Sequence, residues 1–218
     1  MIISNSTRRC HALTWFEVLV IVCVVAVMAA LLFPALSKAK TKHKRIGCLN
    51  SLKQVGVASG IWCGEHAGKF PMQISLTNGG TMELISAGSP LPHFQVMSNE
   101  LNTPRILWCP EDAGRSEARS FETNLARANV SYFVGVDADA VRPATLLAGD
   151  DHLMIDGVSL KAGLAQLWAT ASVSWRRGRH SFGGNICLVD GSVQSASDKQ
   201  LRQALTKSGL TTNRLAMP

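Results

Sequence analysis

The chain has 218 residues, of which 46% are apolar and 17% are charged, and its formal net charge is +7. This composition excludes a disordered chain, and the length suits one domain or one domain with an appendage. A basic chain can bind nucleic acid or anionic lipid. Five basic residues directly follow an apolar run, which favours lipid headgroups, and no aromatic and basic interleaving follows, so we expect no nucleic-acid binding. The five are Lys38, Lys40, Lys42, Lys44 and Arg45.

The apolar run extends from Val18 to Leu36 and contains no charge. As a helix it would span about 28 Å, close to a bilayer core of roughly 30 Å. A cleaved secretory signal peptide is the first interpretation. Arg8 and Arg9 would be its basic n-region, and small residues at its end, as in Ala35-Leu36-Ser37, would mark the cut, although the apolar part of a signal peptide is usually shorter than this run. A plain membrane anchor is the second interpretation, but the basic residues after the run would favour the cytoplasm for the C-terminal side.

The residues before the run support a third interpretation. Residues 12–17 read ALTWFE and follow a short basic leader. This pattern resembles the prepilin signal of type IV pilin-like proteins and type II secretion pseudopilins, in which a small residue precedes the cut and Glu is the fifth mature residue. The resemblance implies that a prepilin peptidase removes residues 1–12 by cutting between Ala12 and Leu13, and that Leu13 is N-methylated. Ala12 stands where Gly is usual, and Trp15 stands where Leu is usual.

Glu17 and Pro34 are the expected assembly residues. Glu17 would lie one helical turn from the Leu13 amine. A carboxylate at this depth costs about 2.5–3.5 kcal/mol, which pairing with an amine would offset. The resemblance implies that this amine belongs to a neighbouring subunit; the alternative is an interfacial Glu17 that reaches headgroups. Pro34 falls at the twenty-second mature position, where pilin-like helices often carry proline. We expect the helix to continue beyond Pro34 with a kink, whereas the alternative is that Pro34 marks the membrane exit.

A second apolar face follows the basic residues at helical spacing. Its members are Cys48, Leu52, Val55, Ser59 and Trp62. We therefore predict one kinked helix from residue 13 to about 63, with a membrane part at 13–36 and an outer half at 37–66 that packs on a globular domain at 67–218. Three glycines spaced four apart predict close approach of a sheet or neighbour along this half. They are Gly56, Gly60 and Gly64.

Short strands broken by turns predict that residues 67–218 form an α+β domain with an antiparallel sheet, as in pilin-like folds. Residues 72–77 and 81–85 predict a hairpin around Asn78-Gly79-Gly80. Residues 105–109, 130–136 and 145–150 predict strands. Residues 185–193 predict a hairpin with a two-residue turn at Asp190-Gly191, and leucines at helical spacing predict a helix over 198–209.

Four short elements support a second resemblance. They are C-L-N-S-L-K-Q from Cys48, G-K-F-P from Gly68, C-P-E-D from Cys109, and His180 followed after nine residues by Asp190-Gly191. Together they resemble a bacterial branch of prepilin-type proteins. Asp190 and Gly191 suit a turn, and we expect His180 to hydrogen-bond across that hairpin. A metal site or catalytic pair made by His180 and Asp190 is the alternative, but no nucleophile motif accompanies them.

We expect no cofactor. Major pseudopilins of type II secretion bind calcium, however, so the same resemblance makes calcium an alternative. Calcium requires six to eight oxygen ligands, and no EF-hand spacing is present. The candidate ligands are Asp137, Asp139, Asp150 and Asp151, with Asp156 nearby.

Four cysteines fall in the expected extracytoplasmic part, where disulfides persist. Cys48 and Cys63 would lie about 22 Å apart on one helix, too far for a bridge. We expect a Cys48–Cys109 disulfide, with free buried thiols as the alternative. The absence of close Cys-x-x-Cys pairs argues against zinc.

The sequence therefore predicts a structural pseudopilin rather than an enzyme. It would span the inner membrane once, with a cytoplasmic N-terminus and a periplasmic C-terminal domain. Its expected partners are other pilin-like subunits, prepilin peptidase, an inner-membrane assembly platform and membrane lipid. Two alternatives remain: a membrane-anchored binding module that does not polymerise, and a periplasmic hydrolase that uses His180 and Asp190.

Overall fold

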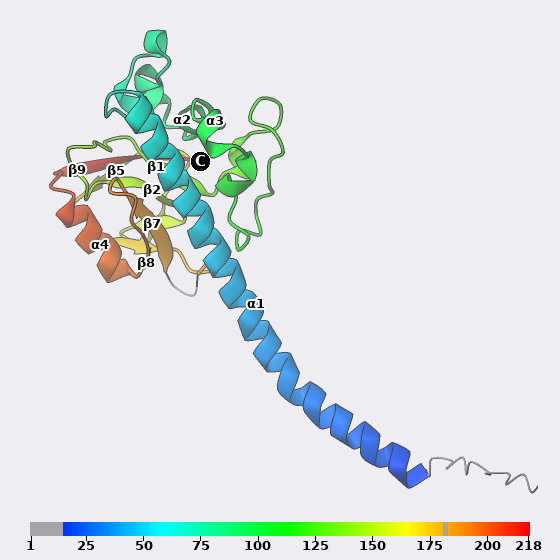
Figure 1. The fold of residues 1–218 in the computed structure, drawn as a ribbon. Coiled ribbons are helices and arrows are strands. Elements are labelled where there is room, and N and C mark those ends of the chain that lie inside the picture. The colour runs from blue at the N-terminus through cyan, green and yellow to red at the C-terminus, as the bar shows by residue number, and fades with distance from the viewer. Residues whose placement is uncertain (1–14, 181–182) are drawn as a thin grey trace, which may run out of the picture. The chain divides into compact units, whose positions relative to one another are not determined.

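The structure is a computed structural model that describes residues 15–180 and 183–218 (Figure 1). The chain divides into two compact units, with the boundary between His43 and Lys44. The described residues form an α+β fold with an apolar N-terminal helix and an antiparallel C-terminal sheet.

Helix α1 (Trp15–Glu65) has 51 residues and continues through Pro34, which agrees with one helix over residues 13–63. Its segment Trp15–Phe33 has a mean hydropathy of 2.9 and none of it is buried. Length and composition make this segment the one helix among the described residues that is able to cross a membrane. The boundary between the two units falls within α1, and the first buried side chain described in this helix is that of Cys48.

The second unit is built on a six-stranded sheet whose pairings are all antiparallel. In spatial order its strands are β5 (Gly163–Trp168), β9 (Thr212–Met217), β1 (Tyr132–Gly135), β2 (Leu146–Asp150), β7 (Gly184–Leu188) and β8 (Val193–Ala196). A three-stranded sheet contains β4 (Val158–Ser159), β3 (Leu153–Ile155) and β6 (Val173–Trp175). The strands predicted over residues 130–136 and 145–150 are present as β1 and β2.

The two faces of the sheet carry separate hydrophobic clusters. Tyr132 packs in a cluster with the second half of α1, whereas its neighbour Phe133 packs in the other cluster, as strand alternation requires. The predicted face of α1 is buried from Cys48 to Trp62, including Ser59. Helix α4 (Asp198–Lys207) confirms the predicted C-terminal helix and contributes Leu201 and Leu205 to the second cluster.

The hairpin predicted over residues 72–85 and the strand predicted over 105–109 are wrong. These segments form the 3-10 helices η1 (Pro71–Gln73), η2 (Leu76–Asn78), η3 (Met82–Ala87) and η4 (Pro104–Leu107). Pro71 and Pro104 each open one of these turns, where the missing proline N–H is not needed. The remaining short elements are α2 (Leu91–Gln95), α3 (Ser98–Leu101) and η5 (Arg127–Asn129).

The hairpin at Asp190-Gly191 exists, but its loop has three residues rather than two. Leu188 accepts a hydrogen bond from Gly191 N–H and donates its own N–H to Ser192. Gly191 has a φ of +78°, so a left-handed glycine closes the loop after a tight turn.

The close approach predicted at three glycines of α1 occurs at one. A Cβ on Gly56 would lie 2.7 Å from Cys187 Sγ of strand β7, whereas Gly60 and Gly64 face open space within 4 Å. No sheet approaches Gly60 or Gly64 among the described residues, and approach of a neighbouring subunit at these two glycines stays a prediction.

Candidate functional site

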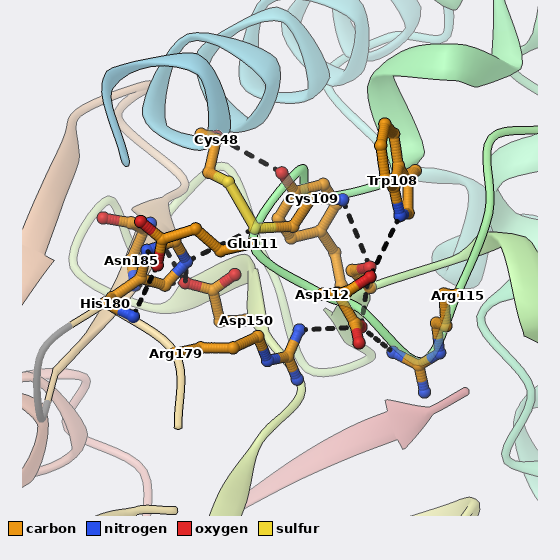
Figure 2. The surroundings of a disulfide bond; sticks show 12 residues. Cys48, Trp108, Cys109, Glu111, Asp112, Arg115, Asp150, Arg179, His180 and Asn185 are labelled. Atoms are coloured by element: carbon orange, nitrogen blue, oxygen red, sulfur yellow. Dashed lines mark hydrogen bonds and ion pairs between the residues drawn. A yellow bond between two sulfur atoms is a disulfide. The ribbon is translucent and has the colours of Figure 1, made fainter. Parts of the chain in front are cut away.

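A disulfide between Cys48 and Cys109 joins helix α1 to the loop after η4 (Figure 2). The two Cα atoms are 5.1 Å apart, and both side chains are fully buried. This is the pair that we expected from the sequence. Tyr132 of β1 adds a second link by donating its hydroxyl hydrogen to the Cys48 carbonyl oxygen at 3.3 Å.

The C-P-E-D loop folds onto the beginning of strand β1. Cys109 N–H donates to Ser131 Oγ at 3.2 Å, and Ser131 Oγ donates to Asp112 Oδ2 at 3.0 Å. Asp112 N–H also donates to the Cys109 carbonyl at 2.8 Å. These bonds hold Glu111 and Asp112 in place, with their carboxylates directed into the domain.

Two arginines and two aspartates form a neutral cluster beside this loop. Arg179 contacts Asp112 Oδ2 at 2.9 Å and also pairs with Asp151. Arg115 contacts Asp151 Oδ2 at 2.6 Å and Asp112 Oδ2 at 3.2 Å. Burial alone would lower the pKa of Arg179, but Asp151 and Asp112 outweigh it and raise that pKa. Removing one partner would leave an uncompensated charge in a poorly hydrated place.

His180 lies between two carboxylates and the disulfide. Its Nδ1 is 3.0 Å from Glu111 Oε2, and its Nε2 is 3.3 Å from Asp150 Oδ2 and 3.4 Å from Cys109 Sγ. Burial by itself would raise the pKa of Asp150, but the bond and charge of His180 outweigh it and lower that pKa. Asp150 Oδ2 also accepts hydrogen bonds from the backbone and side chain of Asn185.

The structure does not bring His180 to the hairpin that follows it. Asp190 instead accepts a hydrogen bond from Ser192 N–H at 2.8 Å and shapes the turn with Gly191. The expected bond of His180 across that hairpin is therefore wrong, since nine intervening residues lead the chain from the cluster to the far end of β7. A His180–Asp190 pair is not seen among the described residues.

The four calcium candidates separate into two places. Asp137 binds the Arg214 guanidinium, and Asp139 accepts the Val141 N–H at 3.1 Å. Asp150 and Asp151 belong to the cluster around His180 and Arg179. The structure therefore does not gather these four carboxylates into one calcium site.

Of the expected processing and assembly residues, the structure describes only the two assembly residues, Glu17 and Pro34. Ala12 and Leu13 lie outside the described residues. Glu17 lies in the exposed first turn of α1, and Pro34 lies within that helix.

Sequence reasoning missed the polar partners of His180. The available signal was the occurrence of charged residues at the ends of buried apolar stretches, as in Asp150-Asp151-His152 and Arg179-His180. Their pairing with Glu111 and Asp112 needed the tertiary fold. The cluster is buried and crosslinked, so its geometry fits a clamp between α1, the C-P-E-D loop and strand β2.

Comparisons with protein-family models, with curated proteins and with solved structures found no match for this chain.

Proposed function

We propose that the protein is a structural subunit of a pilin-like filament of the type II secretion or type IV pilus kind. The observation that carries the proposal is helix α1. One continuous helix joins an exposed apolar segment, Trp15–Phe33, to a second half buried in an α+β domain. No described part of the chain buries the apolar segment Trp15–Phe33. If subunits packed their apolar segments against one another, these side chains would be covered.

The prepilin-like signal supports the same function. Cleavage between Ala12 and Leu13 would leave the apolar helix on the mature protein, with Glu17 one turn from the new amine. In this proposal the subunit is inserted in the inner membrane with its C-terminal domain in the periplasm. Prepilin peptidase processes it, an assembly platform polymerises it with other pilin-like subunits, and a separate motor supplies energy.

The clamp around Cys48 suits a load-bearing subunit. Force along a filament would pass through α1 into the domain. The Cys48–Cys109 bridge links the helix covalently to the loop that holds Arg179 and His180. The proposal therefore gives His180 a structural role and assigns no catalytic residue.

Replacement of Glu17 by Ala tests the proposal. We expect Glu17→Ala to be cut before Leu13 and to fold, but to lose filament assembly, because the carboxylate pairs with the amine of a neighbour. Mass spectrometry of the N-terminus would report cleavage and methylation, and crosslinking with electron microscopy would report assembly. Glu65→Ala, at the exposed end of the same helix, is the matched control and should assemble normally.

Normal assembly of Glu17→Ala would overturn the pairing role. A mature protein that begins near Lys38 would overturn the whole proposal, because the apolar segment would then be a removed signal peptide.

A surface groove favours an anchored binding module as the second candidate. The groove has a volume of about 370 Å³ and lies between the β7–β8 hairpin and α4. Its lining mixes polar and apolar side chains, as carbohydrate ligands require. The polar members are Ser192, Gln194, Gln200, Gln203 and Lys207, and the apolar members are Ala144, Leu188 and Ala204. In that case Glu17→Ala would behave like the parent chain, and carbohydrate binding would depend on the groove.

A further inference from the structure

The disulfide has an imidazole at its side. Cys48, Cys109 and His180 each place one possible ligand atom within 4.8 Å of the other two, and all three side chains are buried (Figure 2). Two thiolates and an imidazole are ligand types that Zn²⁺ prefers. The same three residues therefore offer zinc a site whenever the sulfurs are not bonded to each other.

The distances around His180 already match those of a zinc site. Zinc binds sulfur at about 2.3 Å and nitrogen at about 2.0 Å, so tetrahedral geometry separates these ligand atoms by about 3.5 Å. Nε2 of His180 lies 3.4 Å from Cys109 Sγ. Two sulfur ligands would stand about 3.8 Å apart, so the bond between Cys48 and Cys109 must be absent for zinc to enter.

Glu111 lies beside the imidazole nitrogen that would face away from the zinc ion. Glu111 Oε2 lies 3.0 Å from Nδ1 and accepts the His180 backbone N–H at 2.7 Å. Zinc-bound histidines usually donate their second ring N–H to a carboxylate, which fixes the tautomer. When zinc binds through Nε2, the ring proton would lie on Nδ1, beside Glu111 Oε2.

Asp150 lies next to His180 but does not belong to the group of three ligand atoms. Its side chain is fully buried, and Oδ1 has no hydrogen-bond partner among the described residues. Oδ2 lies 3.3 Å from His180 Nε2 and already accepts two hydrogen bonds from Asn185, so Asp150 is a neighbour of the proposed site rather than one of its ligands.

We propose that the thiol form of this protein binds one Zn²⁺ through three protein ligands, Cys48, Cys109 and His180, and that the disulfide replaces this site on oxidation. As zinc binds, two S–H bonds break, two protons leave and two Zn–S bonds form. On oxidation by an external disulfide, the two thiolates lose two electrons and form the S–S bond, and zinc is released. The oxidant takes up the two electrons with two protons and becomes two thiols. This site does not depend on filament assembly.

The full chain in detergent tests the proposal with zinc chloride as the probe. After reduction by a phosphine and removal of metal with a chelator, we expect one zinc per chain to remain bound through gel filtration, as measured by elemental mass spectrometry. The oxidised chain should bind none. Cobalt(II) in place of zinc should give thiolate-to-metal charge-transfer absorption, and zinc should protect both cysteines from alkylation.

Matched variants assign the site. The double variant Cys48→Ser, Cys109→Ser should lose zinc, whereas Cys63→Ser, which removes a buried cysteine of α1 outside the cluster, should keep it. Glu111→Gln should weaken zinc affinity 10–100-fold while the disulfide still forms.

Three results would overturn the proposal: no stoichiometric zinc on the reduced chain, zinc retained by the double variant, or equal loss in Cys63→Ser. Because reduction of the disulfide could unfold the domain, circular dichroism of the reduced chain is recorded with and without zinc. Zinc that restores the fold supports the site, and a chain that stays unfolded with zinc contradicts it.

Discussion

His180 combines an unusual backbone conformation with a buried side chain. Its φ is +53°, a left-handed value that is uncommon for residues other than glycine but more frequent for histidine. The backbone N–H and the ring both contact Glu111, and the other ring nitrogen faces Asp150. These contacts offset the cost of the left-handed backbone conformation at His180. They also connect the C-P-E-D loop to the end of β2.

Two other buried histidines predict a loss of stability in mild acid. Burial lowers the pKa of His93 and of His152 from 6.5 to about 4. An unfolded chain regains the ordinary value, so below pH 6.5 the unfolded state binds protons that the folded state does not. The free energy of unfolding should be unaffected by these groups above pH 6.5. It should fall toward pH 4 by at most about 1.4 kcal/mol per pH unit for each histidine.

Denaturant unfolding between pH 7.5 and pH 4.5 would measure this slope. His152→Gln and His93→Gln should each make it shallower, whereas His43→Gln, at an exposed position, should not. An unchanged slope in both buried variants would contradict the explanation. Asp150 acts at lower pH, because its depressed pKa makes its contribution disappear only below about 3.8.

At the scale of elements, the contact between α1 and β7 decides how closely helix and sheet approach. Gly56 leaves room for Cys187 Sγ, which is itself fully buried. Gly60 lies one turn further along the same helix with nothing within 4 Å of its missing side chain. A substitution at Gly60 therefore changes helix propensity alone, whereas a substitution at Gly56 changes both helix propensity and packing against the sheet.

Alanine substitutions at these glycines should have opposite effects on stability. Gly60→Ala should stabilise the protein by up to about 1 kcal/mol, because alanine is the better helix former. Gly56→Ala gains the same propensity but adds a methyl group 2.7 Å from sulfur, and overpacking of this kind costs about 1–3 kcal/mol. Thermal unfolding would measure both, and Cys187→Ala should rescue Gly56→Ala. Equal stabilisation at the two positions would contradict this prediction, because it would show that strand β7 shifts to accommodate the added methyl group at no cost in stability.

At the scale of the whole molecule, both hydrophobic clusters lie in the second unit. Every member of either cluster falls between Cys48 and Met217, whereas the described side chains of Trp15–Phe33 are almost all exposed. The described residues of the second unit therefore contain the hydrophobic core, whereas the apolar side chains of Trp15–Phe33 are not buried within the chain.

A fragment of residues 44–218 should fold without the first unit. It contains both clusters, both sheets and the Cys48–Cys109 bridge. We expect a monomer in aqueous buffer with a cooperative thermal transition, measured by circular dichroism and gel filtration. A fragment that begins at residue 67, the expected domain start, should aggregate, because it loses the buried face of α1 from Cys48 to Trp62. A stable fragment from residue 67 would contradict this account of the core.

The local sequence pattern was sufficient to predict an element where the spacing or type of its residues is compatible with one kind of secondary structure. The run of apolar residues specified the first half of α1, and the spacing from Cys48 to Trp62 specified the buried face of its second half. Stretches rich in β-branched, aromatic and aliphatic residues specified β1 and β2, whose residues are all buried. Local pattern failed at residues 72–85, where apolar residues and glycines suit a hairpin but prolines and local hydrogen bonds produce 3-10 turns.

The order of residues was enough to predict the apolar helix, its buried second face and the antiparallel α+β class, because helix and strand periodicity act over short stretches of chain. Helix length excluded a Cys48–Cys63 bridge, but the Cys48–Cys109 pair joins residues 61 positions apart and needed the structure to confirm it. Only the tertiary structure decided that His180 meets Glu111, Asp150 and Cys109 rather than Asp190. That choice depends on how strands far apart in the chain pair and on which buried charges then find partners, and neither is encoded in local spacing.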